Sequence, residues 1–288
     1  MKAIIFGANG QDGFYLDSLC KSKRIETVCV SRTGNFTRCD VSNFNEVDKL
    51  IKSHLPDYVF HLAANSTTRH DALFENHETI STGTLCILEA VKKYCPSARV
   101  FLTGTGLQFV NNRKPIKESD EFQATSPYSV ARIQSVYAAR YYRSLGIKTY
   151  VGYLFHHESP YRKPTHVSQL IALAVKRIAS GSQEVIQLGN ISVEKEWTFA
   201  GDIVDAIFTL VSQDEIFEAT IGSGRPYSIQ EWLTHCFACI HKNWNDYVKI
   251  KENFLAEYSC LVSDPSTIKS LGWEPKVHIS DLASLMVL

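Results

Sequence analysis

The chain has 288 residues, enough for one large or two small domains, and 44% hydrophobic with 21% charged residues is typical of a globular protein. The 30 Lys and Arg residues equal the 30 Asp and Glu residues in number, so the formal net charge is zero. Because no basic excess exists to attract nucleic acid or an anionic membrane surface, we expect neither as a partner.

The first residues, "MKAIIFGANG", do not fit a signal peptide, because the apolar run is short and glycines interrupt it. No apolar stretch approaches the length that spans a bilayer. We therefore expect a cytoplasmic protein whose eight cysteines stay unpaired. The segment "HCFACIH" brings His235, Cys236, Cys239 and His241 together, but it lacks a second ligand pair at zinc-site spacing and is typical of an amphipathic helix. We expect no metal site.

Strand and helix patterns alternate over the first 160 residues. Apolar runs predict strands at residues 2–7, 26–32, 57–64, 98–106 and 148–155, and helical periodicity predicts helices at 12–24, 45–55, 72–95 and 126–146. This alternation predicts an α/β fold with a doubly wound parallel Rossmann sheet and helices on both faces.

The remaining residues, 161–288, have a more mixed pattern. Helices are predicted at 167–181, 202–213 and 228–244, and strands at 185–189 and 217–224. Ser228 and Glu231 have the spacing of a capping box at the start of the last helix. We expect a smaller mixed α/β lobe that binds substrate, interleaved with the first domain over residues 197–222, and a cleft between the two.

The segment "GANGQDG" places Gly7, Gly10 and Gly13 between a predicted strand and a predicted helix. In this context the first glycine allows a tight turn, the second lets the backbone approach a diphosphate, and the third lets helix and sheet pack closely. The free N–H groups of the helix would then bind the anion. The pattern predicts a dinucleotide site.

The end of the second predicted strand bears on which dinucleotide binds. An acidic residue there would favour NAD, but Ser31 and Arg32 occupy the place. Since arginine can pair with a 2′-phosphate, the sequence favours NADP(H), with NAD possible if Arg32 is only a surface residue. Asp40 and Val41 follow as candidate contacts to the adenine.

The segment "SPYSVAR" places Tyr128 and Arg132 one turn apart on a single helix face. Thr103 and Thr105 lie at the carboxyl end of the preceding predicted strand, the edge where parallel sheets bind ligands. A hydroxyl, a tyrosine and a cation beside a nicotinamide suit proton transfer coupled to hydride transfer.

With these motifs, the chain resembles the extended short-chain dehydrogenase/reductase family, and within it the GDP-mannose 4,6-dehydratases and their relatives. The resemblance covers nearly the whole chain through "GANGQDGFYL", "PDYVFHLAANS", "SPYSVAR", "LFHHESPYR", "LGNISVEKEWTFAGDIVDAI" and "DPSTIKSLGWEP".

The resemblance implies a role for individual residues. Tyr128 would be the general acid/base at the C4 oxygen of the sugar, Thr105 would hydrogen-bond the sugar hydroxyl, and Arg132 stands where the family has lysine. His156, Arg162 and Lys195 would bind substrate phosphates. The cofactor would be lined by Gly7, Gly10, Gln11, Asp12, Gly13, Arg32, Asp40, Val41, Leu62, Ala63, Ala64, Tyr128 and Arg132. The family also implies a homodimer that pairs the helices at 72–95 and 126–145.

Departures from the family pattern bear on the reaction. Leu107 stands where the dehydratases carry the glutamate that helps to expel water, and an aliphatic side chain transfers no proton. Arg132 replaces a lysine with a larger, planar cation. Lys195 and Phe254 replace two arginines that clamp the substrate's diphosphate, with Arg162 or Lys163 as substitutes. The chain is also shorter after "HKNWNDYVKI" than a dehydratase of this family.

Three functions remain open. The first is an NADP(H)-dependent oxidoreductase that acts at C4 of a nucleotide-linked sugar, with a GDP-sugar favoured. The second is a dehydratase that uses His156, His157 or Glu158 in place of the missing glutamate. The third is a cofactor-binding homologue without turnover. The first is favoured, because hydride transfer at C4 needs no departing water and therefore tolerates Leu107.

Overall fold

A seven-stranded parallel sheet forms the centre of the larger part of the molecule in the computed structural model, which describes residues 1–251 and 254–288. Its strands, in chain order, are β1 (Lys2–Phe6), β2 (Glu26–Ser31), β3 (Thr37–Arg38), β4 (Tyr58–His61), β5 (Arg99–Thr105), β6 (Thr149–Leu154) and β11 (Glu218–Ile221). The expected doubly wound α/β fold is confirmed.

The strand order is β11-β6-β5-β4-β1-β2-β3. The chain runs outward from β1 to β3, crosses back to β4 beside β1, and then builds the other half of the sheet. This reversal between β1 and β4 is the switch point at which open parallel sheets bind ligands, beyond the carboxyl ends of the strands. The strand β11 lies far along the sequence yet pairs with β6, Glu218 opposite Val151.

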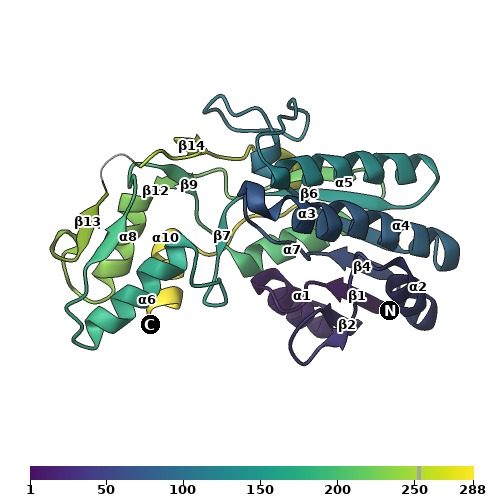
Figure 1. Ribbon diagram of the computed structural model, residues 1–288, viewed down its shortest axis with the longest axis horizontal. Coiled ribbons are helices and arrows are strands. Elements are labelled where there is room, and N and C mark those ends of the chain that lie inside the picture. Colours follow the sequence, from purple (N-terminus) through teal and green to yellow (C-terminus); the bar gives the residue numbers. More distant parts are fainter. Residues whose placement is uncertain (252–253) are drawn as a thin grey trace.

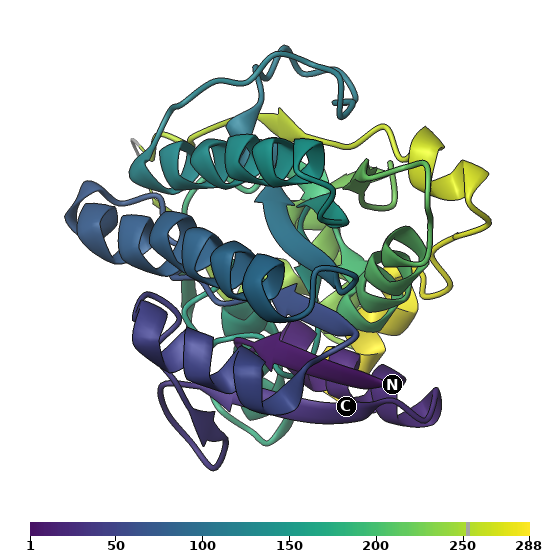
Figure 2. The same cartoon turned by 90° about the vertical axis from the view of Figure 1, so that its right-hand side faces the viewer.

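Helices cover both faces of the sheet, as their apolar stripes require (Figures 1 and 2). One face is covered by α2 (Phe44–His54), α4 (Gly83–Tyr94) and α5 (Pro127–Ser144), whose buried side chains share one core with the strands. The other is covered by α1 (Gln11–Ser22) and α7 (Ala200–Val211), which share a second core. The helix α9 (Ser266–Ser270) packs near α7 and β11.

The predicted helix at 72–95 is a composite. It comprises η1 (His70–Ala72), α3 (Leu73–Asn76), the π-helical η2 (His77–Thr82) and then α4. Gly83 begins α4 where a Cβ would approach Val41 and His61 to within 3.0 and 3.3 Å, so a glycine permits this close packing. The side chains of Ser81 and Thr84 bond to α5 at the Ala131 carbonyl and the Ser135 hydroxyl.

A smaller lobe lies at the left of Figure 1, where α6 (Val167–Ala179), α8 (Ile229–Ala238) and α10 (Ile279–Val287) enclose a separate core. In that core the rings of Trp197 and Trp232 stack, with centroids 4.7 Å apart. Short strands complete it: β7 (His157–Glu158) with β10 (Thr198–Phe199), β8 (Ile186–Leu188) with β13 (Val248–Ile250), and β9 (Glu194–Glu196) between β12 (Pro226–Ser228) and β14 (Cys260–Leu261). Two further turns are η3 (Gly106–Gln108) and η4 (Trp244–Asp246).

Several predicted elements are shorter than expected, among them the strand predicted at 217–224, which ends at Ile221. The helix predicted at 228–244 begins with the expected capping box of Ser228 and Glu231 but ends at Ala238. His241 takes a left-handed φ of 54° and the Lys242 amide returns to the Phe237 carbonyl, which closes the helix. The strand predicted at 57–64 ends at His61, so residues 62–64 leave the sheet at its carboxyl edge.

All eight cysteines are free thiols. Cys236 is buried in α8, and Cys239 donates its thiol to the His235 carbonyl. In residues 1–251 and 254–288, no group of three or more His, Cys, Asp or Glu residues is arranged to hold a metal ion. None of the helices within those ranges is long and apolar enough to cross a membrane.

Candidate active site

A cavity of about 790 Å³ lies beyond the carboxyl ends of β1, β2, β4, β5 and β6. It is lined by the glycine loop on one side, by the starts of α1 and α5, and by the segment that follows β6. This volume falls within the range of sites for small molecules and cofactors. Nearly all of the predicted site residues meet here: Gly7, Gly10, Gln11, Asp12, Gly13, Arg32, Val41, Leu62, Ala63, Ala64, Thr105, Tyr128, Arg132, His156 and Arg162.

The first and last positions of the glycine loop leave no room for a side chain. Gly7 has a φ of +89°, and a Cβ there would come within 2.6 Å of the Ala63 backbone nitrogen. A Cβ on Gly13 would come within 2.6 Å of the Ala8 Cα. Gly10 precedes α1 as its N-cap and supplies no side-chain cap, so the first N–H groups of the helix are left for a ligand. This cradle fits the diphosphate of a dinucleotide.

Arg32 and Val41 line the end of the cavity beyond β2, together with the polar residues Ser31 and Thr33. Arg32 pairs with Glu75 at 3.3 Å, and its side chain is half exposed. Asp40 was expected beside them, but it is not among the described residues that line the cavity. Its carboxylate accepts hydrogen bonds from the amide and hydroxyl of Ser42, which hold it in a local turn.

Tyr128 and Arg132 enter the cavity from α5, which begins with Ser126 as N-cap and Pro127 in its first turn. The Arg132 Cζ lies 5.1 Å from the centroid of the Tyr128 ring. Arg132 is buried, and its Nη1 donates a hydrogen bond to the Thr103 carbonyl at 2.5 Å. The positive charge is therefore fixed against both the tyrosine and the end of β5.

Thr105 ends β5 beside these residues. Its hydroxyl oxygen accepts a hydrogen bond from the Leu107 amide at 3.3 Å, which leaves the hydroxyl hydrogen available to a substrate oxygen. Leu107 itself lines the cavity and packs against the apolar core. Its aliphatic side chain supplies no proton donor or acceptor at this position.

The buried His61 ends β4, close enough to Arg132 for that charge to act on its ring. Burial, together with the charge of Arg132, lowers the pKa of His61 to about 3. The ring is therefore neutral at physiological pH, and Arg132 is the cation at this end of the cavity.

The segment after β6 forms the opposite wall. The Nε2 of His156 lies within hydrogen-bond distance of the Tyr258 hydroxyl oxygen, at 3.0 Å. Burial, followed by the charges of Lys195 and Arg162, holds the pKa of His156 well below its usual value, so the ring is neutral. Burial raises the pKa of the Tyr258 hydroxyl beyond its usual range, so this hydroxyl remains protonated.

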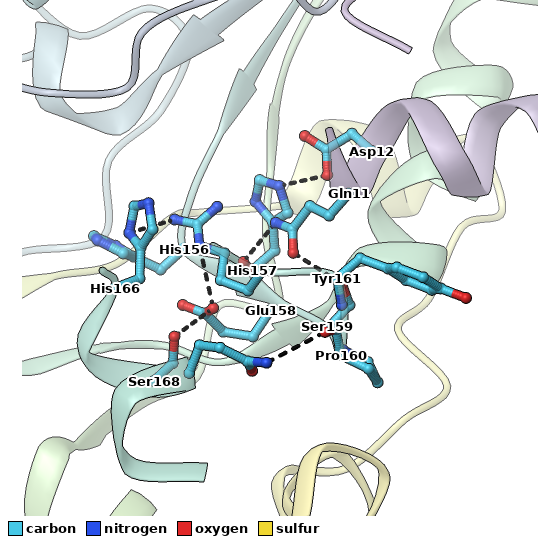
Figure 3. Close-up of polar contacts among 12 residues, drawn as sticks. Gln11, Asp12, His156, His157, Glu158, Ser159, Pro160, Tyr161, His166 and Ser168 are labelled. Carbon is cyan, nitrogen blue, oxygen red and sulfur yellow. Dashed lines mark hydrogen bonds and ion pairs between the residues drawn. The ribbon is translucent and has the colours of Figure 1, made fainter. Parts of the chain in front are cut away.

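His157 and Asp12 form the closest ionic contact across the cavity, 2.9 Å from Nε2 to Oδ1 (Figure 3). The Nδ1 of His157 lies 2.7 Å from the Phe155 carbonyl. Both ring nitrogens thus face acceptors, and the imidazolium form satisfies them both. Burial would lower the pKa of His157, but the charge of Asp12 and the hydrogen bond to it raise the pKa above its usual value.

Arg162 lines the cavity as expected and has fixed partners. Its Nη2 contacts the Nδ1 of His166 at 3.1 Å, and its Nε pairs with Glu158 at 3.4 Å. Burial, with the charge of Arg162, lowers the pKa of His166 to about 4. Glu158 is buried, accepts a hydrogen bond from Ser168, and is not among the described residues that line the cavity.

The predicted substrate residue Lys195 is also absent from the described lining of the cavity. It is buried in β9, with Nζ 4.6 Å from the centroid of the Trp197 ring. Successive side chains of a strand point to opposite faces, so Lys195 lies on the same face as Trp197, two residues further along the chain.

Several lining residues were not expected from the sequence. Residues 65–68 follow β4 at the same sheet edge as the glycine loop. Because open parallel sheets bind ligands beyond the carboxyl ends of their strands, this position could have been predicted from the sequence. Glu257 and Tyr258 come from an irregular segment, and Glu257 accepts a hydrogen bond from Thr68 across the cavity. Residues in irregular segments have no helical or strand periodicity, so their place in the cavity could not be predicted from the sequence.

Comparisons with known proteins point to one family. The family model described as GDP-mannose 4,6 dehydratase matches residues 4–286. The GDP-mannose 4,6 dehydratase 2 of Arabidopsis thaliana is 29% identical, over 99% of this chain and 85% of that protein. The GDP-mannose 4,6-dehydratase of Vibrio cholerae is 27% identical, over 100% of this chain and 93% of that protein.

Solved structures share the fold. The UDP-glucose 4-epimerase of Thermus thermophilus, in complex with NAD, superimposes with a TM-score of 0.85 at 18% identity, covering 100% of this chain and 98% of that one. The RMD protein of Pseudomonas aeruginosa, complexed with NADPH, gives a TM-score of 0.84 at 20% identity, covering 99% and 96%. These similarities confirm the Rossmann architecture.

Proposed function

Because the chain belongs to the GDP-mannose 4,6-dehydratase family, we propose that it is an enzyme that moves a hydride between NADP(H) and C4 of a GDP-linked sugar. The observation that carries this proposal is the meeting of Thr105 and Tyr128 with the glycine loop in one cavity. The same cavity holds the cations that a nucleotide sugar needs, Arg162 and Lys163.

The residues present fit a nicotinamide dinucleotide. Gly7, Gly10 and Gly13 leave room for the diphosphate at the start of α1, and residues 62–64 line the route toward Tyr128. Arg32 supports NADP(H) over NAD(H), because its guanidinium lines the adenosine end and the residues that end β2 are not acidic. The carboxylate that lines this end, Glu75, is paired with Arg32 itself. When bound, the nicotinamide supplies the hydride acceptor or donor.

The chain's own residues supply the proton chemistry. In the direction of oxidation, Tyr128 removes the proton of the C4 hydroxyl as the C4–H bond breaks and the C4–O bond becomes a carbonyl. Thr105 donates its hydroxyl hydrogen to the same oxygen and holds it in place. Arg132 stabilises negative charge on the tyrosine from its position over the ring. In the direction of reduction, C4 receives the hydride and Tyr128 gives its proton to the C4 oxygen, while Thr105 keeps its hydrogen bond to that oxygen.

Full 4,6-dehydration is the second candidate, and the family match favours it. Of the residues that could replace the missing glutamate, Glu158 is tied to Ser168 and Arg162, and His157 is tied to Asp12. His156 lines the cavity beside Tyr258, but burial and nearby positive charge hold its pKa well below the usual value, which makes it a weak base. Leu107 weighs against this candidate, since the position beside Thr105 carries no acid or base.

Product analysis separates these candidates. The purified protein is incubated with NADPH and GDP-4-keto-6-deoxymannose, and separately with NADP⁺ and GDP-mannose. Oxidoreductase activity consumes the reduced nicotinamide in the first mixture, whereas dehydration yields a 4-keto-6-deoxy sugar in the second without net change of cofactor. Tight NADP⁺ binding with no product in either mixture would indicate a binding protein without turnover. Tyr128→Phe is the control and should abolish either reaction.

A further inference from the structure

Two consecutive residues of the glycine loop, Gln11 and Asp12, are held by the segment that crosses from β6 to the smaller lobe (Figure 3). The Gln11 amide nitrogen donates to the His157 carbonyl at 3.1 Å, and its oxygen accepts from the Ser159 hydroxyl at 2.9 Å. Asp12 pairs with the His157 ring at 2.9 Å. Contacts between residues some 145 positions apart in sequence thus fix the loop on which the cofactor would rest.

Asp12 places a negative charge where the proposed site must also accept an anion. It lies in the first turn of α1 and lines the cavity, at the helix end that would hold the cofactor's diphosphate. A carboxylate there would repel that diphosphate at the very point where the helix attracts it. Some positive charge must therefore accompany Asp12 for the site to accept an anion.

The ring of His157 supplies this charge. Its two nitrogens face the Asp12 carboxylate and the Phe155 carbonyl, both of them acceptors, so the ring carries two protons. We propose that His157 is a positioning residue of the cofactor site, which neutralises Asp12 as an imidazolium and so allows the diphosphate to bind at the start of α1. The inference rests on the proposed function, in that the glycine loop holds a dinucleotide.

The surroundings keep this pair ionised. Burial would raise the pKa of Asp12, but the charge and hydrogen bond of His157 outweigh it and lower that pKa, helped by the charges of Arg162 and Arg132. His156 is the other titratable neighbour, and its ring is neutral. Arg162 is turned toward Glu158 and His166, so His157 is the cation in direct contact with Asp12.

The sign of the pH dependence follows. Because the pKa of His157 is raised, the imidazolium is present below that pKa and is lost as the pH rises through it. Asp12 then remains charged without its partner. Affinity for NADP⁺ should therefore fall as the pH is raised from neutral into the alkaline range.

Equilibrium binding of NADP⁺ to four proteins tests the proposal: the unaltered chain, His157→Gln, Asp12→Asn and the double variant. At neutral pH we expect His157→Gln to weaken binding about tenfold, as expected for one uncompensated charge near the diphosphate. Asp12→Asn should bind within about threefold of the unaltered chain, and so should the double variant, because removal of the acid removes the need for its partner. The alkaline loss of affinity should be absent from the double variant.

Ser159→Ala is the matched control, because it removes a contact to the same loop without changing any charge. It should leave the shape of the pH profile unchanged. Equal NADP⁺ affinity in His157→Gln and the unaltered chain would overturn the proposal, and so would a double variant as weak as His157→Gln. If His157→Gln does not fold, the pH profile of the unaltered chain against Asp12→Asn decides the matter. Failure of the unaltered chain to bind NADP⁺ at all would instead contradict the proposed function.

Discussion

The guanidinium of Arg132 lies over the ring of Tyr128, with Cζ 5.1 Å from the ring centroid, and is anchored by its hydrogen bond to the Thr103 carbonyl. Arginine thus stands in place of the family's lysine. Its guanidinium lies against the face of the Tyr128 ring, and its Nη1 contacts the end of β5. Its Nε is buried without a hydrogen-bond partner among the described residues. Two contacts therefore fix the charge, and both can be tested separately.

Arg132→Met should lower kcat about tenfold or more, because the charge that stabilises ionised Tyr128 is lost. Arg132→Lys should retain most of kcat, since a cation still reaches the ring, but it loses the fixed geometry of the guanidinium. Steady-state kinetics with separate measurement of NADP⁺ affinity checks both variants. Arg177→Met, which removes an exposed arginine on α6, is the control. Full activity of Arg132→Met would contradict the role given to this cation.

Leu107→Glu should add dehydration to the reaction. The substitution returns a carboxylate to the cavity wall next to Thr105, where a proton acceptor is otherwise missing. With GDP-mannose and NADP⁺, mass spectrometry should show a new product lighter by one water. Burial of a carboxylate at a half-buried position should also cost about 1–3 kcal/mol of folding free energy. Leu107→Gln has the same size without a basic group, and an equal gain of product in that variant would refute the explanation.

Arg32→Ala should reduce affinity for NADP⁺ about tenfold or more while leaving affinity for NAD⁺ within about twofold, because the guanidinium would pair only with the 2′-phosphate. Glu75→Ala removes the carboxylate that now holds Arg32 and should strengthen NADP⁺ binding. Fluorescence titration with both cofactors measures these changes. Parallel losses for the two cofactors in Arg32→Ala would show that Arg32 does not distinguish them.

Lys195→Met should stabilise the protein at pH 7. Burial, as the largest effect, lowers the pKa of Lys195 from 10.5 to about 8. The native state therefore binds the proton of Lys195 more weakly than the unfolded chain does. Stability therefore rises with pH between 8 and 10.5 in the natural chain, and this penalty of about 3 kcal/mol at pH 7 is absent from the variant. The cation–π contact with Trp197 offsets part of it, which leaves a net gain of about 1–2 kcal/mol.

Urea unfolding at pH 7 and pH 10.5 measures the free energy of unfolding of Lys195→Met and of the natural chain. The advantage of the variant should shrink or reverse at the higher pH. Lys114→Met, at an exposed lysine, should change the free energy of unfolding little at either pH. A variant at Lys195 that is less stable at pH 7 would show that the buried charge is stabilising after all.

Much of this architecture could be predicted from residue patterns. The alternation of apolar runs and helical periodicity predicts the parallel sheet, because buried strands and amphipathic helices have distinct local spacing. The same patterns place Gly7 and Thr105 at strand ends, and the helix start at "SPYSVAR" places Tyr128 in the first turn of α5, in the cavity. Pairing of the helices at 72–95 and 126–145 in a homodimer stays a prediction.

Other features depend on contacts between distant residues. The local turn at Asp40 and the packing of Lys195 on Trp197 follow from tertiary structure, and neither leaves a periodic signal. The pairing of Asp12 with His157 joins segments about 145 residues apart, and only the folded chain shows it. Tyr258 reaches His156 from an irregular segment for the same reason.

Isotope transfer tests the central claim most directly. The protein is incubated with GDP-4-keto-6-deoxymannose and NADPH deuterated at the transferable position of the nicotinamide, and with NADP⁺ and GDP-mannose deuterated at C4. We expect deuterium to reach C4 of the sugar in the first mixture or to leave C4 in the second, and Tyr128→Phe to suppress the transfer about a hundredfold or more. Retention of the label in both mixtures, with cofactor and sugar nucleotide bound, would contradict hydride transfer at C4.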